Sequence, residues 1–555
     1  MYFEYPRFEW VEPPELRGAA IRHTVAIVGA GPVGLTAALD LARHGVRAVV
    51  VDDKDSVSVG SRAICISRHS LEGLQQLGLA ERFTAHALGW THGTSFYRSD
   101  PVFRLEMPHS PHERYLPMYN LQQPFIELYL AQAAQAEPLL EMRWQSRVTS
   151  ARQAGDCAVL AIDGPGGCYE LNACYVIAAD GARSTLRQAL GLTLQGDNHV
   201  GRYVIVDIRL RSAYPTERRA YFDCPANPGA TVLVHRQPHD IWRIDYQLQA
   251  DEDAASAVAE PAIRARVAAI LDMLGEREPW TLEWWSLYQA HTLCLDDYRA
   301  GRVFFAGDSA HLVPIFGVRG LNSGFADALN LSWKLAAVLA GAAPERLLDS
   351  YSPERRGATL DIFEQAGRST RFMAPPTAGF RKLRDATLGL ARDGHVFAQR
   401  LLDPRQSQPY TYAVSPLTTP DSDVWRGGPA PGAPLANRRL ADGSFLLDEL
   451  GVGYTGLYFS RTGISASDLA TLPRIGGLAG TPLRLLVIGE RSEHADDLWY
   501  LCDPDGEIAA AHDAVDGSFY LVRPDRHVCA RRKRYDPDAI MRAWATSLGH
   551  AQGLT

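Results

Sequence analysis

Cysteine is sparse in this chain, and no two cysteines stand at a metal-binding or redox-active spacing. The 555 residues include eight cysteines, without a Cys-x-x-Cys pair or a Cys/His cluster of the zinc-finger type. Such a pattern indicates neither a zinc site nor a disulfide framework. We therefore expect no metal site, and we expect the cysteines to be reduced.

Long apolar runs and a surplus of basic residues are also lacking. No stretch approaches the roughly 18 consecutive apolar residues of a membrane span. The first twenty residues lack the apolar core of a secretory signal. The net charge is −8 and the pI is near 6.1, which argues against a nucleic-acid partner. We expect a cytoplasmic protein with neither membrane nor nucleic-acid partners.

A glycine-rich loop near the N-terminus is the first feature that points to a ligand. The apolar run Val25 to Val28 leads into Gly29, Gly31 and Gly34, then a helical pattern and a strand that ends at Asp52. This is the order of a dinucleotide-binding unit, with the acid at about the expected 20-residue spacing. The glycines would admit a pyrophosphate, and Asp52 would hold ribose hydroxyls. A lone GxGxxG is weak evidence, but one in this full context is fairly strong.

Two further apolar strands end in an acid beside a glycine. Val303 to Ala306 leads into Gly307 and Asp308, and a helical pattern begins near Leu321. The free N–H groups of Gly320, Leu321 and Asn322 would favour negative charge. A third strand runs into Asp180 and Gly181. Taken alone, the second motif is common in α/β proteins, and the third is also a favoured β-turn pair.

Together the three motifs resemble those of the FAD-dependent aromatic hydroxylases, the single-component flavoprotein monooxygenases of the para-hydroxybenzoate and phenol hydroxylase type. The resemblance covers about residues 22 to 400. It implies that the glycine loop binds the FAD pyrophosphate, that Asp180 and Gly181 serve FAD and the passing nicotinamide, and that Gly307 and Asp308 bind the ribityl chain. The implied FAD contacts are Gly29, Gly31, Gly34, Asp52, Arg62, Gln123, Asp180, Gly181, Gly307, Asp308, Pro314, Gly320, Leu321 and Asn322. Arg62 could equally be a surface arginine, and Gln123 a helix-start residue.

The chain departs from the family pattern before the flavin helix. Many relatives carry Pro-Pro and a Gly-Gln-Gly loop there, whereas this sequence has Pro314-Ile315 and Val318-Arg319-Gly320. Arg319 places a cation close to the expected negative charge of the reduced flavin and would favour the anionic form. Alternatively, Arg319 points to solvent.

The motif positions imply a discontinuous FAD domain with an inserted sheet. Two segments alternate between apolar and polar residues, 204–211 and 242–249, as half-buried antiparallel strands do. We expect an α/β fold: a Rossmann-like FAD-binding domain of the para-hydroxybenzoate hydroxylase type, an inserted antiparallel substrate sheet and a thioredoxin-like C-terminal domain. The expected divisions are an N-terminal arm (1–20), the FAD domain (21–195 and 290–402), the substrate domain (196–289, with part of 85–120 possible), a linker (403–438) and the C-terminal domain (439–555).

The C-terminal part has its own strands, 483–488 and 518–522, and a terminal helix over 536–548. It is similar to the thioredoxin-like domain of the phenol hydroxylase branch. Because it lacks Cys-x-x-Cys, it has no dithiol to cycle. An interface or stabilising role is therefore expected.

The resemblance implies that NADH or NADPH reduces FAD, and that a flavin C4a-hydroperoxide then transfers one oxygen atom from O2 to an electron-rich ring. A dry pocket would protect this species, and Phe316, Trp242 and Tyr246 are candidates to line it. A phenol reacts better as a phenolate, so a base or hydrogen-bond partner would help. The candidate catalytic residues are His235, Arg243, Tyr246 and Arg319; His311 has a positional claim but is usually structural.

Three hypotheses follow. The first is hydroxylation of a small phenolic acid, similar to 3-(3-hydroxyphenyl)propionate. The second is hydroxylation, epoxidation or Baeyer–Villiger oxidation of a polycyclic aromatic polyketide. The third is a flavin-binding protein without turnover, which the intact acids Asp52, Asp180 and Asp308 argue against. The aromatic substrate, the nicotinamide preference and the oligomeric state, for which a homodimer is one possibility, are not determined by the sequence.

Overall fold

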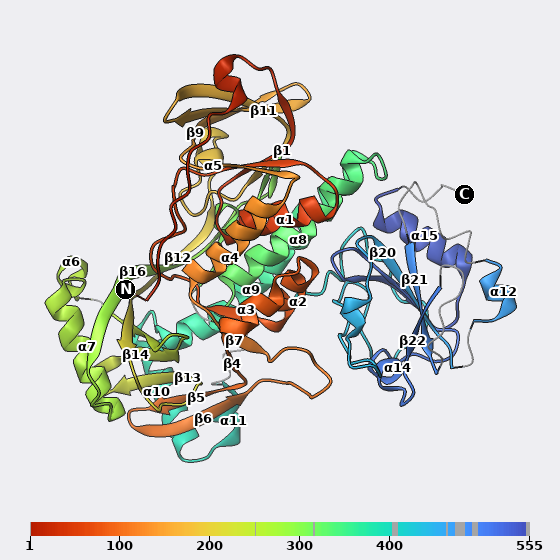
Figure 1. The fold of residues 1–555 in the computed structure, drawn as a ribbon. Coiled ribbons are helices and arrows are strands. Elements are labelled where there is room, and N and C mark those ends of the chain that lie inside the picture. Colours follow the sequence, from red (N-terminus) through yellow and green to blue (C-terminus); the bar gives the residue numbers. More distant parts are fainter. Residues whose placement is uncertain are drawn as a thin grey trace.

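The computed structural model describes residues 2–249, 251–314, 317–401, 409–461, 464–471, 483–490 and 498–550 (Figure 1). Within these ranges, the strands form two eight-stranded sheets, one five-stranded sheet and one three-stranded sheet. This mixed α/β architecture confirms the predicted α/β fold class, while the thioredoxin-like assignment of the C-terminal part stays a prediction.

The first eight-stranded sheet carries the glycine motifs. Its main path runs β17-β18-β11-β1-β2-β8, and β18, β11, β1, β2 and β8 pair in parallel. β1, β2 and β18 read as short apolar runs because buried parallel strands are covered on both faces. Figure 1 shows α1, α4 and α8 together beside this sheet. The bounds are β1 Arg22–Val28, β2 Ala48–Val51, β8 Leu140–Arg143, β9 Arg147–Ala154, β10 Cys157–Gly164, β11 Gly167–Ala178, β17 Arg299–Ala300, β18 Val303–Phe305, α1 Pro32–Arg43, α4 Gln123–Ala136 and α8 Gly320–Leu339.

The second eight-stranded sheet contains β12 and β15, for which the sequence predicts a substrate sheet, and it is called the substrate sheet from here on. Its order is β19-β16-β12-β15-β14-β13-β5-β6, so the hairpin β5–β6 from the N-terminal half completes one edge. Helix α7 packs on one face through Ile263, Val267 and Ile270. The bounds are β5 His92–Tyr97, β6 Asp100–Glu106, β12 Gln195–Leu210, β13 Arg218–Cys224, β14 Asn227–Arg236, β15 Ile241–Gln247, β16 Trp280–Cys294, β19 His311–Leu312, α6 Ala254–Ala257 and α7 Glu260–Leu274.

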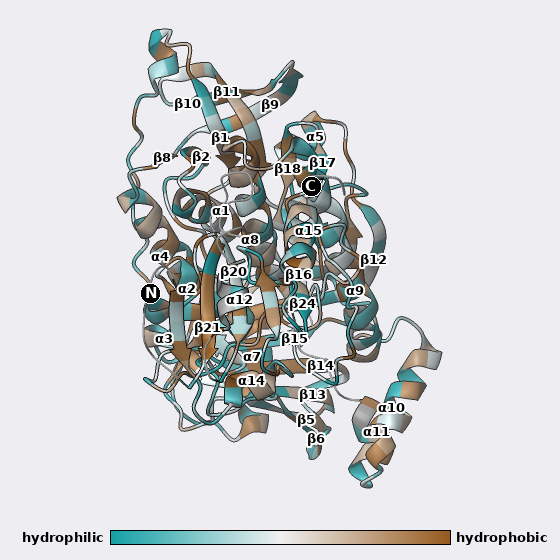
Figure 2. Ribbon diagram, turned by 90° about the vertical axis from the view of Figure 1, so that its right-hand side faces the viewer, coloured by the Kyte–Doolittle hydropathy of each residue, from teal (hydrophilic) through white to brown (hydrophobic). Residues whose placement is uncertain are grey.

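The remaining elements before the C-terminal domain are the N-terminal arm, a three-stranded sheet of order β3-β7-β4 and several helices. The N-terminal arm lies on the first domain, where Phe8 stacks on Trp144 with ring centroids 4.1 Å apart. Helices α10 and α11 lie at one edge of the molecule (Figure 2), where Leu388, Ala391 and Ala398 pack against Tyr97 and Val102 of the β5–β6 hairpin. The bounds are η1 Pro14–Arg17, β3 Cys65–Ser67, β4 Leu88–Trp90, β7 Met118–Asn120, α2 Arg68–Gln76, α3 Ala80–His86, α5 Thr185–Ala189, η2 Gly307–Ser309, η3 Glu345–Ser350, α9 Tyr351–Met373, α10 Ala378–Arg392 and α11 Val396–Leu401.

The C-terminal domain is built on a five-stranded sheet of order β22-β21-β20-β23-β24. β20, β21 and β22 are parallel, and β23 and β24 form an antiparallel pair. The bounds are η4 Leu446–Asp448, β20 Tyr454–Phe459, β21 Leu483–Gly489, β22 Leu498–Cys502, β23 Phe519–Val522, β24 Val528–Arg532, α12 Ala466–Leu469, α14 Glu507–Ala511 and α15 Pro537–Ser547. No described helix is long and apolar enough to cross a membrane.

Candidate active site

A cavity of about 1610 Å³ lies between the carboxyl ends of the parallel strands and the substrate sheet. This volume exceeds the 300 to 1,000 Å³ typical of a pocket for one drug-sized ligand. Nearly all of the predicted cofactor residues line it: Gly29, Gly31, Asp52, Arg62, Gln123, Asp180, Gly181, Gly307, Asp308, Pro314, Gly320, Leu321 and Asn322. The cavity can hold a dinucleotide and a second molecule together.

The three loop glycines have different structural roles. A Cβ at Gly29 would lie 2.3 Å from the carbonyl oxygen of Ala179, and one at Gly34 would lie 1.9 Å from the carbonyl oxygen of Gly29. A Cβ at Gly31 would meet no atom within 4 Å, because this glycine faces the cavity. Gly29 and Gly34 therefore allow strand and helix to pack, while Gly31 leaves space for a ligand; Gly34 does not line the cavity.

Asp52 is buried at the end of β2 and holds the glycine loop in place. Its Oδ2 accepts a hydrogen bond from the N–H of Ala30 at 2.6 Å, and its Oδ1 accepts one from the N–H of Lys54 at 2.9 Å. Burial raises the pKa of Asp52. Since a carboxylate offers about four acceptor sites, the ribose contact expected for Asp52 is compatible with these two bonds.

Asp180 ends the strand beside β1. Its Oδ2 accepts from the N–H of Leu186 at 3.1 Å, whereas its buried Oδ1 has no hydrogen-bond partner among the described residues. Gly181 follows with φ of +77°, a conformation that glycine adopts readily. A buried acceptor of this kind is expected to bind a donor on a ligand.

Asp308 projects from the loop after β18 into the cavity. Protein surrounds it, and this burial raises its pKa, yet its side chain remains exposed to the cavity. We find no hydrogen-bond donor for its carboxylate in the described chain. The loop itself is fixed by Asp327 on α8, whose Oδ2 accepts from the N–H of Gly307 at 2.9 Å and lies 2.7 Å from Nε2 of His311. His311 is thus structural.

The N-terminus of α8 faces the same cavity. Gly320, Leu321 and Asn322 line it, so the first free N–H groups and the positive end of a 20-residue helix meet there. The Asn322 amide is held by the backbone of β3, with Nδ2 3.1 Å from the carbonyl oxygen of Cys65. Val318, just before the helix, has φ of +60°, a strained conformation for a β-branched residue.

Arg62 and Gln123 meet at the rim. The side-chain oxygen of Gln123 accepts from the N–H groups of Arg62 and Ala63 at 3.2 and 3.1 Å. Gln123 starts α4 and also shapes the loop that carries Arg62, whose exposed side chain borders the cavity. Pro314 lines the opposite edge. Arg319 is 6% exposed, so it does not point to bulk solvent.

Arg243, proposed from the sequence as a catalytic group, is held in a buried ion pair. Its Nε and Nη2 donate to the two carboxylate oxygens of Asp207 at 2.9 and 2.8 Å. The same guanidinium donates to the backbone carbonyls of Ser61 and Arg62. It therefore anchors the rim loop to the substrate sheet, while one edge still borders the cavity.

Arg218, His235 and Asp245 of the sheet also line the cavity, and no hydrogen-bonded ion pair like that of Arg243 holds them in the described chain. His235 is 5% exposed and its Nδ1 has no hydrogen-bond partner in the described chain. Burial, followed by the charges of Arg218 and Arg243, holds the pKa of His235 well below its ordinary value, so its imidazole is neutral. Arg218 and Asp245 were not identified from the sequence because nothing local distinguishes them from other strand residues.

Tyr246 does not belong to this site, which corrects its sequence-based assignment. Alternate residues of a strand face opposite sides. Arg243 and Asp245 face the cavity, whereas Trp242 and Tyr246 belong to the core under α7. The guanidinium of Arg266 covers the Tyr246 ring at 5.2 Å. The expectation that apolar residues of this sheet line the pocket was wrong for these two; Phe316 lies outside the described residues.

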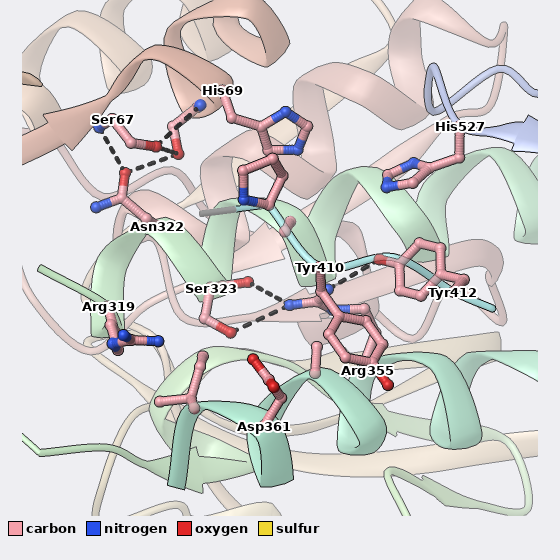
Figure 3. Close-up of a pocket in the computed structure, with 15 residues that line it drawn as sticks. Ser67, His69, Arg319, Asn322, Ser323, Arg355, Asp361, Tyr410, Tyr412 and His527 are labelled. Atoms are coloured by element: carbon pink, nitrogen blue, oxygen red, sulfur yellow. Dashed lines mark hydrogen bonds between the residues drawn. The ribbon is translucent and has the colours of Figure 1, made fainter. Parts of the chain in front are cut away.

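A second, smaller cavity of about 50 Å³ lies behind the start of α8 (Figure 3). Arg319 and Asn322 border both cavities. Figure 3 shows Arg355 of α9 reaching Ser323 and Tyr412, with Nη1 2.8 Å from the Tyr412 hydroxyl. His527 of the C-terminal domain also lines this cavity. The helix start that faces the large cavity therefore adjoins the domain junction.

The residues present fit FAD. Gly31 leaves open space where the loop and helix α1 meet, Asp180 offers a buried unpaired acceptor, and Asp308 presents an unpaired carboxylate. The N-terminus of α8 would stabilise negative charge at the far end of the same cavity. These features suit a ligand with a pyrophosphate, several hydroxyls and a ring that becomes anionic.

Comparisons with known proteins agree. The model of the FAD binding domain matches residues 22–366. A 3-(3-hydroxy-phenyl)propionate/3-hydroxycinnamic acid hydroxylase of Mycolicibacterium smegmatis is 28% identical over 525 residues, covering 90% of this chain and 89% of that protein. A protein of the same name from Burkholderia cenocepacia is 29% identical over 522 residues, covering 92% and 94%.

Two solved structures extend the comparison to nearly the whole chain. The flavin-dependent monooxygenase PieE, in complex with FAD and substrate, superimposes with a TM-score of 0.80 at 25% identity, over 96% of this chain and 100% of that chain. Aklavinone-11 hydroxylase with FAD and aklavinone gives 0.76 at 23% identity over 96% and 100%, which supports the fold. The chain therefore belongs to the FAD binding domain family, as a flavoprotein monooxygenase of the FAD-dependent aromatic hydroxylase type.

Proposed function

We propose that this protein hydroxylates a small phenolic acid with NADH or NADPH and O2, using bound FAD. The observation that carries the proposal is the position of the polar patch of Arg218, His235 and Asp245. The patch lines the same cavity as the flavin-binding motifs. A substrate with an ionised group and a phenol hydroxyl would satisfy these buried polar side chains, as an apolar one would not.

Arg218 is the residue best suited to hold a substrate carboxylate. It begins β13, and we find no hydrogen bond or ion pair of its guanidinium in the described chain. Burial lowers its pKa but leaves the group protonated, because arginine does not lose its proton in proteins. A carboxylate would pair with this cation, consistent with the phenylpropionate named for the relatives.

The proposed FAD contacts divide among the motifs already described. Gly29 and Gly31 would admit the pyrophosphate, Asp52 would bind the ribose, and Asp308 would accept from the ribityl hydroxyls. When bound, FAD supplies electron transfer from the nicotinamide and the activation of dioxygen. The chain's own part is to orient the ring against the sheet, to keep water out and to place Arg319 and the start of α8 where negative charge develops.

The nicotinamide cofactor is proposed to dock transiently. The sequence has a single GxGxxG in a strand–helix context, so no second dinucleotide fold is indicated. Asp180 and Gly181 lie at the border of the cavity where a passing cofactor would contact the FAD domain.

A polycyclic aromatic polyketide is the second candidate substrate. Its support is the cavity volume of about 1610 Å³, together with the likeness to aklavinone-11 hydroxylase. Against it stands the charged patch, because a large neutral ring system would leave Arg218 without a counter-ion.

The test is oxidation of NADH and NADPH with oxygen uptake by the purified yellow protein, over a panel of phenolic acids and polycyclic phenols. Hydrogen peroxide is measured in parallel. A small phenolic acid that stimulates oxidation without equivalent peroxide supports the proposal. Stimulation by polycyclic compounds alone would favour the second candidate substrate, a polycyclic aromatic polyketide. If no aromatic compound changes the rate, the proposal is wrong.

A further inference from the structure

The substrate sheet carries one carboxyl group that faces the cavity and whose buried oxygen lacks a hydrogen bond in the described chain. Asp245 lies in β15, is 6% exposed, and its Oδ1 makes no hydrogen bond with any described residue. Arg243 forms a long ion pair with it, with Nε 4.0 Å from Oδ1, too far for a hydrogen bond. Asp207, in contrast, accepts two hydrogen bonds from the same guanidinium.

The pairing register shows which groups surround this carboxyl. Arg243 stands opposite Asp207 on β12 and opposite His235 on β14, while Asp245 stands opposite Ile205 and Leu233. The next strand contributes Arg218, and β3 contributes Cys65, both lining the same cavity. The charged or titratable groups around Asp245 are therefore Arg218, Arg243, Asp207, His235, Cys65 and Tyr203, a residue of β12 whose phenol pKa is raised by burial and by the charge of Asp245.

These neighbours leave Asp245 able to carry a proton or to release it. Burial raises its pKa to about 7; Arg243 and Arg218 oppose this effect, and Asp207 adds to it. The depressed pKa of His235 makes its imidazole a weak proton acceptor. Burial raises the pKa of the Cys65 thiol to about 12, so the thiol keeps its proton near neutral pH. A general base works best when its pKa lies close to the working pH.

We propose that Asp245 is the catalytic base that removes the proton from the substrate's phenol group, and this inference rests on the proposed function. In this step the phenolic O–H bond breaks, its electron pair stays on oxygen as a phenolate, and the proton forms a new bond to a carboxylate oxygen of Asp245. No electrons are exchanged with another group. Arg218 lines the same cavity and would pair with the substrate's carboxylate, while the phenolate ring becomes richer in electrons for attack on oxygen.

The experiment compares Asp245→Asn with the wild-type holoenzyme. The probe is 3-(3-hydroxyphenyl)propionate. Its analogue 3-(3-methoxyphenyl)propionate, which has no phenolic proton to lose, is the comparison ligand. Ultraviolet difference spectra between about pH 5.5 and 9.5 report ionisation of the bound phenol, which in free phenols occurs near pH 10. Asp240→Asn is the matched control, because Asp240 lies in the turn before β15 and does not line the cavity.

In the wild type, hydroxylation is expected to speed up as Asp245 loses its proton near neutral pH, well below the pH at which a free phenol ionises. Asp245→Asn should slow hydroxylation at neutral pH by about 10²- to 10⁴-fold, with recovery as the pH approaches the ionisation of the bound phenol that the difference spectra report. Affinity for the methoxy analogue should change less than about fivefold, because no proton is transferred to Asp245. Asp240→Asn should behave as wild type. A rate and pH–rate profile that are unchanged in Asp245→Asn would overturn the assignment.

A second measurement applies even if no phenol binds and the proposed function fails. Infrared difference spectra of the holoenzyme should show a protonated carboxyl band that disappears near neutral pH and is missing in Asp245→Asn. That result supports a proton-exchanging Asp245 independently of the substrate. A carboxylate that is fully ionised from about pH 5 upward would overturn the assignment whatever the substrate is.

Discussion

The Glu354 carboxylate on α9 and the Arg523 guanidinium of the C-terminal domain form a buried ion pair, with Nη1 2.6 Å from Oε1. Lys334 of α8 donates to the other oxygen of Glu354 at 2.6 Å, and Asp525 completes the charge balance around Arg523. The next residue of α9, Arg355, binds Asp327, which holds the N–H of Gly307. The C-terminal domain is thus connected through buried charges to the loop that carries Asp308.

Replacement of Arg523 by Met should destabilise the protein strongly. It leaves Glu354 and Asp525 with one cation fewer in a buried site, and breaking a buried pair costs about 3–5 kcal/mol. Thermal unfolding should therefore shift down by several degrees. The matched control is Arg461→Met, since Arg461 and Glu490 form an exposed pair worth about 0–1 kcal/mol. Equal effects of the two substitutions would contradict the role given to the buried network.

Acid should weaken this same network. Burial alone would raise the pKa of Glu354, but Arg523 and Lys334 outweigh it and hold the pKa well below its ordinary value. Arg523 and His527 do the same for Asp525. A carboxyl with a depressed folded-state pKa stabilises the fold above its unfolded pKa of about 4.3. That contribution is lost as the pH falls through the folded-state value.

The stability difference between wild type and Glu354→Gln should therefore be largest near neutral pH and shrink below about pH 4.3. Unfolding midpoints measured as a function of pH test this. Glu490→Gln, at the exposed pair, should show almost no difference at any pH. A gap between wild type and Glu354→Gln that stays constant into acid would show that the carboxylate's charge is not what stabilises the fold.

The cofactor motifs could be predicted from the sequence because each is a local pattern. Gly29 to Gly34, Gly307 and Asp308 are set by a strand, a turn and a helix that are close in the chain. The substrate patch could not be predicted in this way. His235 and Arg243 were named from their strands, but their difference in role depends on Asp207, which pairs with Arg243 across strands. Such contacts depend on the pairing register of the strands and on the face of the sheet to which each side chain points.

The same reasoning explains the error at Tyr246. Alternation along β15 shows that Tyr246 and Asp245 face opposite sides, but not which side bears the cavity. The amphipathic helix α7 covers the face of Tyr246. This is a tertiary contact, which the local pattern of β15 does not determine. The polar face then borders the flavin site, contrary to the general rule that the apolar face of a sheet lines the ligand pocket.

A substitution in the glycine loop can test FAD binding separately from folding. Gly31→Ala should fold with nearly the wild-type unfolding midpoint yet lose most of its FAD, because the new methyl group meets no protein atom and enters the cavity. The absorbance ratio of flavin to protein, after purification and after addition of free FAD, measures this. Gly389→Ala is the control, since that glycine in α10 also has free space around it but lies outside the site. Full retention of FAD by Gly31→Ala would contradict the proposal that the FAD pyrophosphate lies next to Gly31.

Asp308→Ala should also give a folded but pale protein. The carboxylate is surrounded by protein yet unpaired, so its removal costs little stability and takes away an acceptor for the ribityl hydroxyls. A loss of one charge-assisted hydrogen bond, about 1.5–3 kcal/mol, would weaken FAD binding roughly 10- to 150-fold. Equilibrium dialysis of FAD measures it, with Asp349→Ala at the exposed surface as the control. A protein that stays fully yellow and active would refute the ribityl assignment.

Arg319 gives the last prediction, because it borders both cavities beside the start of α8. Arg319→Gln removes a positive charge where the reduced flavin is expected to become anionic, so the pKa of the reduced cofactor should rise. Less charge stabilisation should also divert more oxygen to hydrogen peroxide during NAD(P)H oxidation. Titration of the reduced holoenzyme by absorbance, together with the ratio of peroxide to NAD(P)H, tests both effects. If the pKa and the ratio are unchanged, Arg319 acts only in packing at the domain junction, and the helix N-terminus alone stabilises the negative charge.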